Sequence, residues 1–232
     1  MENNPTILLS FPRSGNHLIR FIIEFLTLKP TSGCKSNNKD KPIYTNNFKD
    51  KTVLANVNKT ADFICYKCHF VKHIKEDFIN TTHNLILIIR DPKECINRHR
   101  SLDPKNKIKK QKNLHSKLYL ENIEYYHNFK NKKLLIYYED IIQHPKKIIN
   151  QLFKFFNSKR YQYKKLINNI NYYFDQSATA TGRAWAGIIS GNDINYHSAK
   201  MTEEEKINFI DEINETIKDY IVTIKYINKY IK

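Results

Sequence analysis

The sequence predicts an α/β fold, a three-layer sandwich in which helices flank a central, mainly parallel sheet. Short apolar runs alternate with amphipathic stretches along the chain, and this alternation is typical of parallel sheets joined by right-handed crossovers. The run NLILIIR at 84–90 shows no polar–apolar alternation, as expected of a central strand that is covered on both faces. Ligands of such sheets bind at the carboxyl ends of the strands, so we expect the functional residues there.

Each predicted element follows from a local pattern. Short apolar runs predict strands at 6–10, 63–70, 84–90 and 133–138. Apolar periodicity and capping signals predict helices at 14–28, 91–102, 112–129, 145–156 and 201–230. The first helix carries an apolar stripe at Leu18, Phe21, Ile22 and Phe25, and the last carries one at Ile207, Ile210, Ile217, Ile221 and Ile224. Residues 29–60 are polar and irregular and are predicted to be a loop or lid, within a single domain that spans 1–232.

The composition is rich in basic residues and contains few cysteines. The formal net charge of +16 favours an anionic partner, although lysines are spread along the whole chain and most are expected to be solvated. No apolar run is long enough to predict a membrane span. The N-terminus does not resemble a secretory signal, so a cytoplasmic location is expected. The four cysteines, Cys34, Cys65, Cys68 and Cys95, are therefore predicted to be free thiols.

The turn after the first predicted strand is a candidate anion site. The stretch LLSFPRSGNHLIR ends an apolar run and begins an amphipathic helix. The first N–H groups of a helix lack helical partners, and the helix dipole adds positive charge there. Arg13 adds a permanent cation, and Gly15 allows a ligand to approach closely. Ser14, Asn16 and His17 add side-chain donors.

The turn lacks the chemistry of an ATP-binding P-loop. That motif requires Gly, four residues and then Gly-Lys-Ser/Thr. Here Gly15 is followed by Asn16 and His17, and no glycine stands five residues earlier. The turn is therefore P-loop-like in placement only, and an ordinary strand-to-helix turn is the alternative interpretation.

The stretch Pro12-Arg-Ser-Gly-Asn-His-Leu18 resembles the 5′-phosphosulfate loop of the sulfotransferase family, commonly Pro-Lys-Ser-Gly-Thr-Thr-Trp. These enzymes use 3′-phosphoadenosine 5′-phosphosulfate (PAPS) and release the desulfated nucleotide (PAP). The resemblance implies the P-loop-like sulfotransferase fold, PAPS as the sulfuryl donor and no metal ion. It also implies that the 5′-phosphosulfate is bound by Arg13, Ser14, Gly15, Asn16 and His17.

Lys67 and His69 stand at the end of the second predicted strand. Because side chains alternate along a strand, these two face the same way and Cys68 faces away. Lys67-Cys68-His69 resembles the family's Lys-Thr-His, which implies that His69 is the general base for an acceptor hydroxyl. Lys67 and Arg13 would then steady the charge on the reacting oxygens. Alternation also separates Cys65 from Cys68, so their Cys-x-x-Cys spacing does not predict a metal or redox site.

Arg90 ends the third predicted strand, and a helix-starting Asp-Pro follows it. A capping ion pair with the adjacent aspartate is the purely structural interpretation. The resemblance implies instead that Arg90, together with a serine eight residues later, binds the 3′-phosphate of PAPS. Position 98 is arginine here and the nearest serine is Ser101, so either Arg98 or Ser101 is the predicted second ligand. Arg183 is the only cation in the segment that corresponds to the family's Arg-Lys-Gly triplet, so it is a further predicted ligand.

Two further stretches extend the resemblance over most of the chain. LIYYED at 135–140, followed by His144-Pro145, is similar to the family's Tyr-Glu-Asp … Pro strand and helix. Gly191-Asn-Asp193 loosely resembles its Gly-Asp-Trp-Lys-Asn segment. We therefore expect a sulfotransferase that moves a sulfuryl group from PAPS to a hydroxyl, or an amine, of a small-molecule or saccharide acceptor.

Three alternatives stay open. A nucleotide kinase or NTPase of the same architecture is disfavoured by the missing Gly-Lys-Ser/Thr. A nucleic-acid-binding module is suggested by the charge and by the run KNKIKKQK at 105–112, but no nucleic-acid motif accompanies that run. A relative that binds the nucleotide without turnover is suggested by arginine at position 98. The sequence carries no signal for an oligomeric state.

Overall fold

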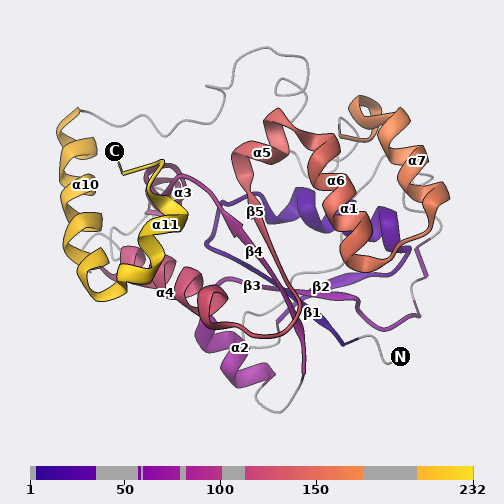
Figure 1. The fold of residues 1–232 in the computed structure, drawn as a ribbon, viewed down its shortest axis with the longest axis horizontal. Helices are drawn as coiled ribbons and strands as arrows, with labels where there is room; N and C mark the ends of the chain where they lie inside the picture. Colours follow the sequence, from indigo (N-terminus) through magenta and orange to yellow (C-terminus); the bar gives the residue numbers. More distant parts are fainter. Residues whose placement is uncertain are drawn as a thin grey trace.

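Five parallel strands form the centre of the part of the chain that the structure describes (Figure 1). The computed structural model describes residues 4–34, 57–58, 60–78, 82–100, 113–174 and 203–231. In chain order the strands are β1 (Thr6–Ser10), β2 (Thr31–Gly33), β3 (Cys65–Cys68), β4 (Asn84–Ile89) and β5 (Lys133–Tyr137). They lie in the order β2-β3-β1-β4-β5, and every neighbouring pair is parallel. The predicted α/β class with a central parallel sheet is confirmed.

Helices cover both faces of the sheet, as the three-layer prediction requires (Figure 1). One face carries α1 (Asn16–Thr27), α5 (Tyr138–Gln143), α6 (Pro145–Phe156) and α7 (Arg160–Asn168). The other carries α2 (Val71–Asp77), α3 (Pro92–Arg100), α4 (Leu114–Asn128), α10 (Glu203–Ile217), the 3-10 helix η4 (Lys218–Thr223) and α11 (Ile224–Ile227). The sequence pattern missed α2, α5 and α7, which are short. None of the described helices is both long and apolar enough to cross a membrane.

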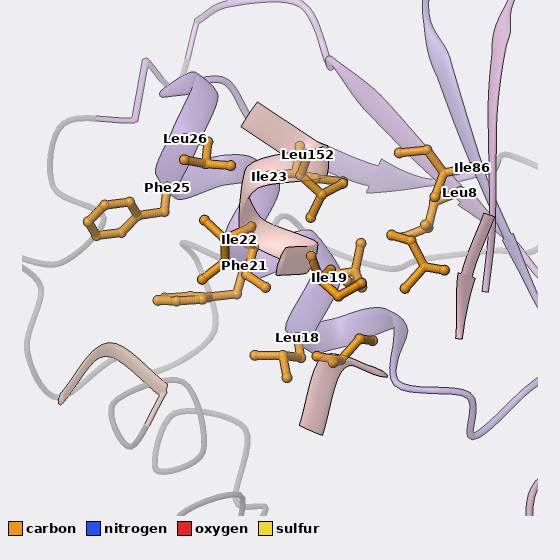
Figure 2. Packing of buried hydrophobic residues seen from close by; sticks show 14 of the residues in the cluster. Leu8, Leu18, Ile19, Phe21, Ile22, Ile23, Phe25, Leu26, Ile86 and Leu152 are labelled. Carbon is orange, nitrogen blue, oxygen red and sulfur yellow. The ribbon is translucent and has the colours of Figure 1, made fainter. Parts of the chain in front are cut away.

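Two apolar cores lie against the two faces of the sheet. Residues of β4 alternate between them: Ile86 and Ile88 join the core under α1 and α6, whereas Leu85, Leu87 and Ile89 join the core under α4 and α10. This double burial explains the unbroken apolar run of the strand. Figure 2 shows the first core, in which the predicted stripe of α1 packs among residues of the sheet and α6. Each of the four stripe residues is at most 2% exposed.

The predicted loop at 29–60 begins with a strand that the sequence pattern missed. β2 pairs with β3 and is held by two buried charged residues of α1. Arg20 Nε donates to Thr31 Oγ1 at 2.9 Å, and the Thr31 N–H donates to Glu24 Oε1 at 2.9 Å. Buried charges require such partners, so polar contacts rather than an apolar run specify this edge strand. Residues 35–56 of the predicted lid lie outside the described residues.

The prediction of four free thiols is wrong for one pair. β2 runs parallel beside β3, and the Cys34 N–H donates to the Lys67 carbonyl at 3.0 Å. This pairing brings the Cα atoms of Cys34 and Cys68 to 5.7 Å, and the two residues form a disulfide, as that separation allows. Cys65 and Cys95 are free and buried. Cys65 and Cys68 lie in opposite cores, as strand alternation predicts.

The predicted C-terminal helix at 201–230 is interrupted. The backbone of Tyr220 is not helical, with φ −130° and ψ 44°. Its ring is buried and its hydroxyl donates to Glu121 Oε1 at 3.4 Å, so packing against α4 accompanies the break. The isoleucine stripe predicted for a continuous helix is wrong beyond Ile217, because Ile221 is 70% exposed and Ile224 is 37% exposed.

Candidate active site

Two residues with positive φ shape the turn between β1 and α1. Arg13 has φ 70° and Gly15 has φ 88°. Glycine adopts this region freely, whereas for arginine it is strained by roughly 1–2 kcal/mol. α1 begins directly afterwards, at Asn16, so the positive end of its dipole lies at the turn.

Packing as well as backbone geometry requires a glycine at position 15. A Cβ placed there would lie 2.5 Å from Cδ2 and 2.6 Å from Cε2 of the Tyr138 ring. The Arg90 guanidinium carbon lies 4.3 Å from the centroid of the same ring. Tyr138 therefore supports both the turn and Arg90. The sequence pattern did not identify Tyr138 as a site residue, although its place at the carboxyl end of β5 was a usable signal.

The predicted residues of the turn differ in accessibility. Arg13 and His17 are partly exposed, whereas the three residues between them are buried. Asn16 Oδ1 is buried without a hydrogen-bond partner. Ser14 Oγ is close to the Cys95 thiol, but no hydrogen bond of standard geometry joins them. Arg13 and His17 can therefore meet a ligand directly, while the buried polar atoms leave the turn's hydrogen bonding incomplete.

His69 follows β3 and is held against the end of β1. Its Nδ1 lies 2.8 Å from the carbonyl oxygen of Ser10. A carbonyl can only accept, so Nδ1 carries the proton and Nε2 keeps its lone pair. Asn122 of α4 donates Nδ2 to the carbonyl of His69 at 2.9 Å. Through these contacts the imidazole is fixed in the tautomer that can take a proton at Nε2.

The imidazole of His69 is neutral at neutral pH. Burial lowers its pKa to about 3, and the charge of Lys67 contributes in the same direction, while the bond to the Ser10 carbonyl opposes both. Lys67 is itself only 5% exposed. The two residues therefore interact at this strand end. An anion bound nearby would raise the pKa of His69 toward the range of an effective general base.

Arg90 joins the end of β4 to the turn after β1. Its Nη1 donates to the carbonyl of Arg13 at 2.9 Å. Its Nη2 lies 3.8 Å from Glu94 Oε2. Arg90 therefore forms an ion pair with Glu94 of α3, and not with the adjacent Asp91 as the purely structural interpretation expected. Asp91 instead caps α3, because its Oδ1 accepts from the Lys93 N–H at 2.8 Å. The β4 end and the β1 turn are thus brought into direct contact.

Positive charge gathers at this edge of the sheet. Burial lowers the pKa of the partly exposed Arg98, and the charges of Arg90 and Arg13 contribute to the shift. The pKa of His99 is likewise lowered by burial and by Arg13. Three arginines within electrostatic reach of one another favour a bound anion with several oxygens. Of the two alternatives for the second 3′-phosphate ligand, the structure places Arg98 here, whereas Ser101 lies outside the described residues, as does Arg183.

The described residues fit an anionic nucleotide. The arginines, the N-terminal N–H groups of α1 and the Ser14 hydroxyl offer donors to phosphate and sulfate oxygens. Within the described ranges, no group of three or more His, Cys, Asp or Glu side chains could hold a metal ion. The chemistry that this arrangement can support is anion binding with proton transfer at His69.

The fold matches solved sulfotransferase structures. The mouse sulfotransferase SULT7A1 complexed with PAP aligns with a TM-score of 0.59 and 15% identity, over 99% of this chain and 90% of its own. Retinol dehydratase complexed with androsterone and inactive cofactor PAP, and the same enzyme with retinol and PAP, each align with a TM-score of 0.53 and 13% identity, over 94% of this chain and 82% of theirs. No protein-family model and no curated protein sequence matches the chain. The chain therefore has the sulfotransferase fold.

Proposed function

We propose that this protein is an enzyme that transfers a sulfuryl group from PAPS to a hydroxyl, or an amine, of a small-molecule or saccharide acceptor. The fold, shared with sulfotransferases whose structures contain PAP, supports the proposal. The observation that carries it is the 2.8 Å contact between His69 Nδ1 and the Ser10 carbonyl. This contact directs the basic nitrogen of a neutral imidazole away from the main chain, next to a turn suited to a phosphosulfate.

The β1 turn and the β4 end would hold opposite ends of the nucleotide. Arg13, His17 and the first N–H groups of α1 would bind the 5′-phosphosulfate. Arg90 and Arg98 would bind the 3′-phosphate, which adenosine 5′-monophosphate and ATP lack. Arg183 is proposed as a further ligand of this phosphate on the strength of the sequence resemblance alone.

His69 would act as the general base. When bound, PAPS supplies an activated sulfuryl group. As the acceptor oxygen forms its bond to sulfur and the bond from sulfur to the phosphate oxygen breaks, Nε2 takes the acceptor's proton. Lys67 and Arg13 would stabilise the negative charge that builds on the departing phosphate oxygen, which is the kind of electrostatic contribution that dominates many transfer reactions.

The test separates catalysis from binding. In His69→Asn the amide can still donate to the Ser10 carbonyl, but nothing remains to take a proton. We expect this variant to bind PAP with the affinity of the unmodified protein in calorimetric titration. It should transfer radiolabelled sulfate from PAPS to a panel of acceptors about 10²–10⁴-fold more slowly. The matched control is His144→Gln, which changes an exposed histidine outside the site and should leave both quantities unchanged.

Three outcomes would contradict the proposal. Near-normal transfer by His69→Asn would remove His69 from the role of base. Stabilisation of the protein against heat by ATP with Mg²⁺, and not by PAP, would instead indicate a kinase or NTPase. Binding of DNA or RNA with a steep salt dependence, without binding of PAP, would indicate a nucleic-acid-binding protein.

A further inference from the structure

The peptide unit between Arg90 and Asp91 is bound at both of its polar atoms by side chains from elsewhere. Its carbonyl oxygen accepts from Tyr119 Oη at 2.8 Å. Its N–H donates to Glu139 Oε1 at 3.2 Å. Tyr119 lies on α4 and Glu139 on α5, so side chains from helices on opposite faces of the sheet bind one peptide at the end of β4.

The C-terminal segment contacts the same Glu139 carboxylate. Tyr230 Oη donates to the other carboxylate oxygen of Glu139, and Lys229 Nζ lies 3.6 Å from that same oxygen. Tyr230 is only 8% exposed and belongs to the core on the α4 face. Figure 1 shows that this segment, in yellow, lies on the same side of the sheet as α3, α4 and α10. One carboxylate therefore links the last residues of the chain to the start of α3.

We propose that Tyr230, acting through Glu139, is a positioning residue for the nucleotide site: it holds the Arg90–Asp91 peptide, and so fixes where Arg90 and Arg98 meet the 3′-phosphate. This inference rests on the proposed function. A hydroxyl donating to one carboxylate oxygen restricts the carboxylate's rotation, so the other oxygen stays aimed at the Asp91 N–H. Because Asp91 is also the cap of α3, a shift of this peptide moves the helix that carries Arg98.

The experiment compares two nucleotides that differ only in the 3′-phosphate. PAP and adenosine 5′-monophosphate are titrated into the full-length protein by calorimetry, with and without the substitution Tyr230→Phe, which removes one oxygen and keeps the ring. We expect the Kd of PAP to rise about 3- to 10-fold. The substitution removes the hydrogen bond from Tyr230 to the Glu139 carboxylate, which does not itself contact the ligand but holds the peptide next to Arg90. The Kd of adenosine 5′-monophosphate should not change.

Tyr226→Phe is the matched control. It removes a hydroxyl from the same segment, where Tyr226 contacts His127 at 3.2 Å and not the site, and it should leave both affinities unchanged. A loss of affinity in Tyr230→Phe that is equal for the two nucleotides, or a loss as large in Tyr226→Phe, would overturn the inference. So would an unchanged Kd for PAP in Tyr230→Phe.

Substitutions of Glu139 provide a second series. Glu139→Gln keeps one acceptor oxygen and should weaken PAP binding less than Glu139→Ala, which releases both the Asp91 N–H and the Tyr230 hydroxyl. Equal effects of the two substitutions would contradict the positioning role. If the unmodified protein itself does not bind PAP, the proposed function fails. If it binds and the Tyr230 and Glu139 variants bind equally well, only this inference fails.

Discussion

The two sides of the candidate site are held in different ways. On the Arg90 side, side chains of Tyr119, Tyr138 and Glu139 surround the end of β4. On the His69 side, the contacts are to main-chain atoms: the Ser10 carbonyl binds the imidazole, and Asn122 binds the carbonyl of His69. The expected phosphate ligands are therefore positioned by side chains that surround a strand end, whereas the expected base is positioned through main-chain carbonyl groups.

Gly15→Ala should have the largest effect, on the Arg90 side. The added methyl group collides with the Tyr138 ring and the residue must keep φ near 88°, so we expect a loss of about 2–5 kcal/mol in the free energy of unfolding. The Kd of PAP should rise by more than about tenfold, since Arg90 rests on the same ring.

Denaturant unfolding and calorimetry measure these two effects. Combining Gly15→Ala with Tyr138→Ala removes the collision, so the double substitution should cost less than the sum of the two single ones. Strict additivity would show that the ring does not set the requirement for glycine.

Cys34→Ser should have the next largest effect, on the His69 side. It opens the disulfide to Cys68, which precedes His69 directly. The bond closes a loop with a sequence separation of 34, and its loss should cost roughly 2–4 kcal/mol of stability. A reductant should lower the melting temperature of the unmodified protein and leave that of the variant unchanged. An equal response of both proteins to the reductant would mean that the disulfide does not support this side.

Acidification should also act on the His69 side. The pKa of His69 in the folded protein is about 3, below the unfolded value of about 6.5. The unfolded chain therefore binds this proton first, so stability is present above pH 6.5 and falls as the pH drops from 6.5 toward 3, by up to about 1.4 kcal/mol per pH unit. Urea unfolding across this range should show that the free energy of unfolding falls less steeply with decreasing pH in His69→Asn than in His144→Gln. The same slope in both variants would contradict the low pKa.

The smallest expected effect is that of Asn122→Ala. It removes the donor to the carbonyl of His69 and should lower stability by about 0.5–1.5 kcal/mol. Turnover should fall more than PAP affinity, because the contact holds the base and not the arginines. Asn128→Ala, at an exposed position near the end of the same helix, serves as the control. A larger change in PAP affinity than in turnover would contradict the view that Asn122 supports the base and not the phosphate ligands.

Short-range patterns predicted much of the fold and the strand ends at which the candidate site residues lie. The apolar runs gave the correct places for β1, β4 and β5. The structure places Arg13, Lys67, His69 and Arg90 at or just after the carboxyl ends of strands, while their roles stay predictions. Alternation also correctly separated Cys65 from Cys68. These inferences succeeded because strand period and strand ends are properties of a few consecutive residues.

Contacts between distant segments could not be predicted in this way. Tyr230 meets Glu139 across a sequence separation of 91, and Cys34 meets Cys68 only because β2 pairs with β3. β2 itself depends on the contacts of Thr31 with buried charges in α1 rather than on an apolar run. The interruption at Tyr220 likewise accompanies packing against α4. Each of these features follows from tertiary structure, which a local pattern does not contain.

The most direct test of the central claim, that the turn after β1 and the end of β4 together bind an adenosine bisphosphate, is a calorimetric titration of the unmodified protein with PAP and with adenosine 5′-monophosphate. We expect saturable binding of both, with a Kd for PAP about 10- to 100-fold lower, because the arginines gain charge-assisted bonds to the 3′-phosphate. Equal affinities for the two nucleotides, or no saturable binding of PAP, would contradict the account.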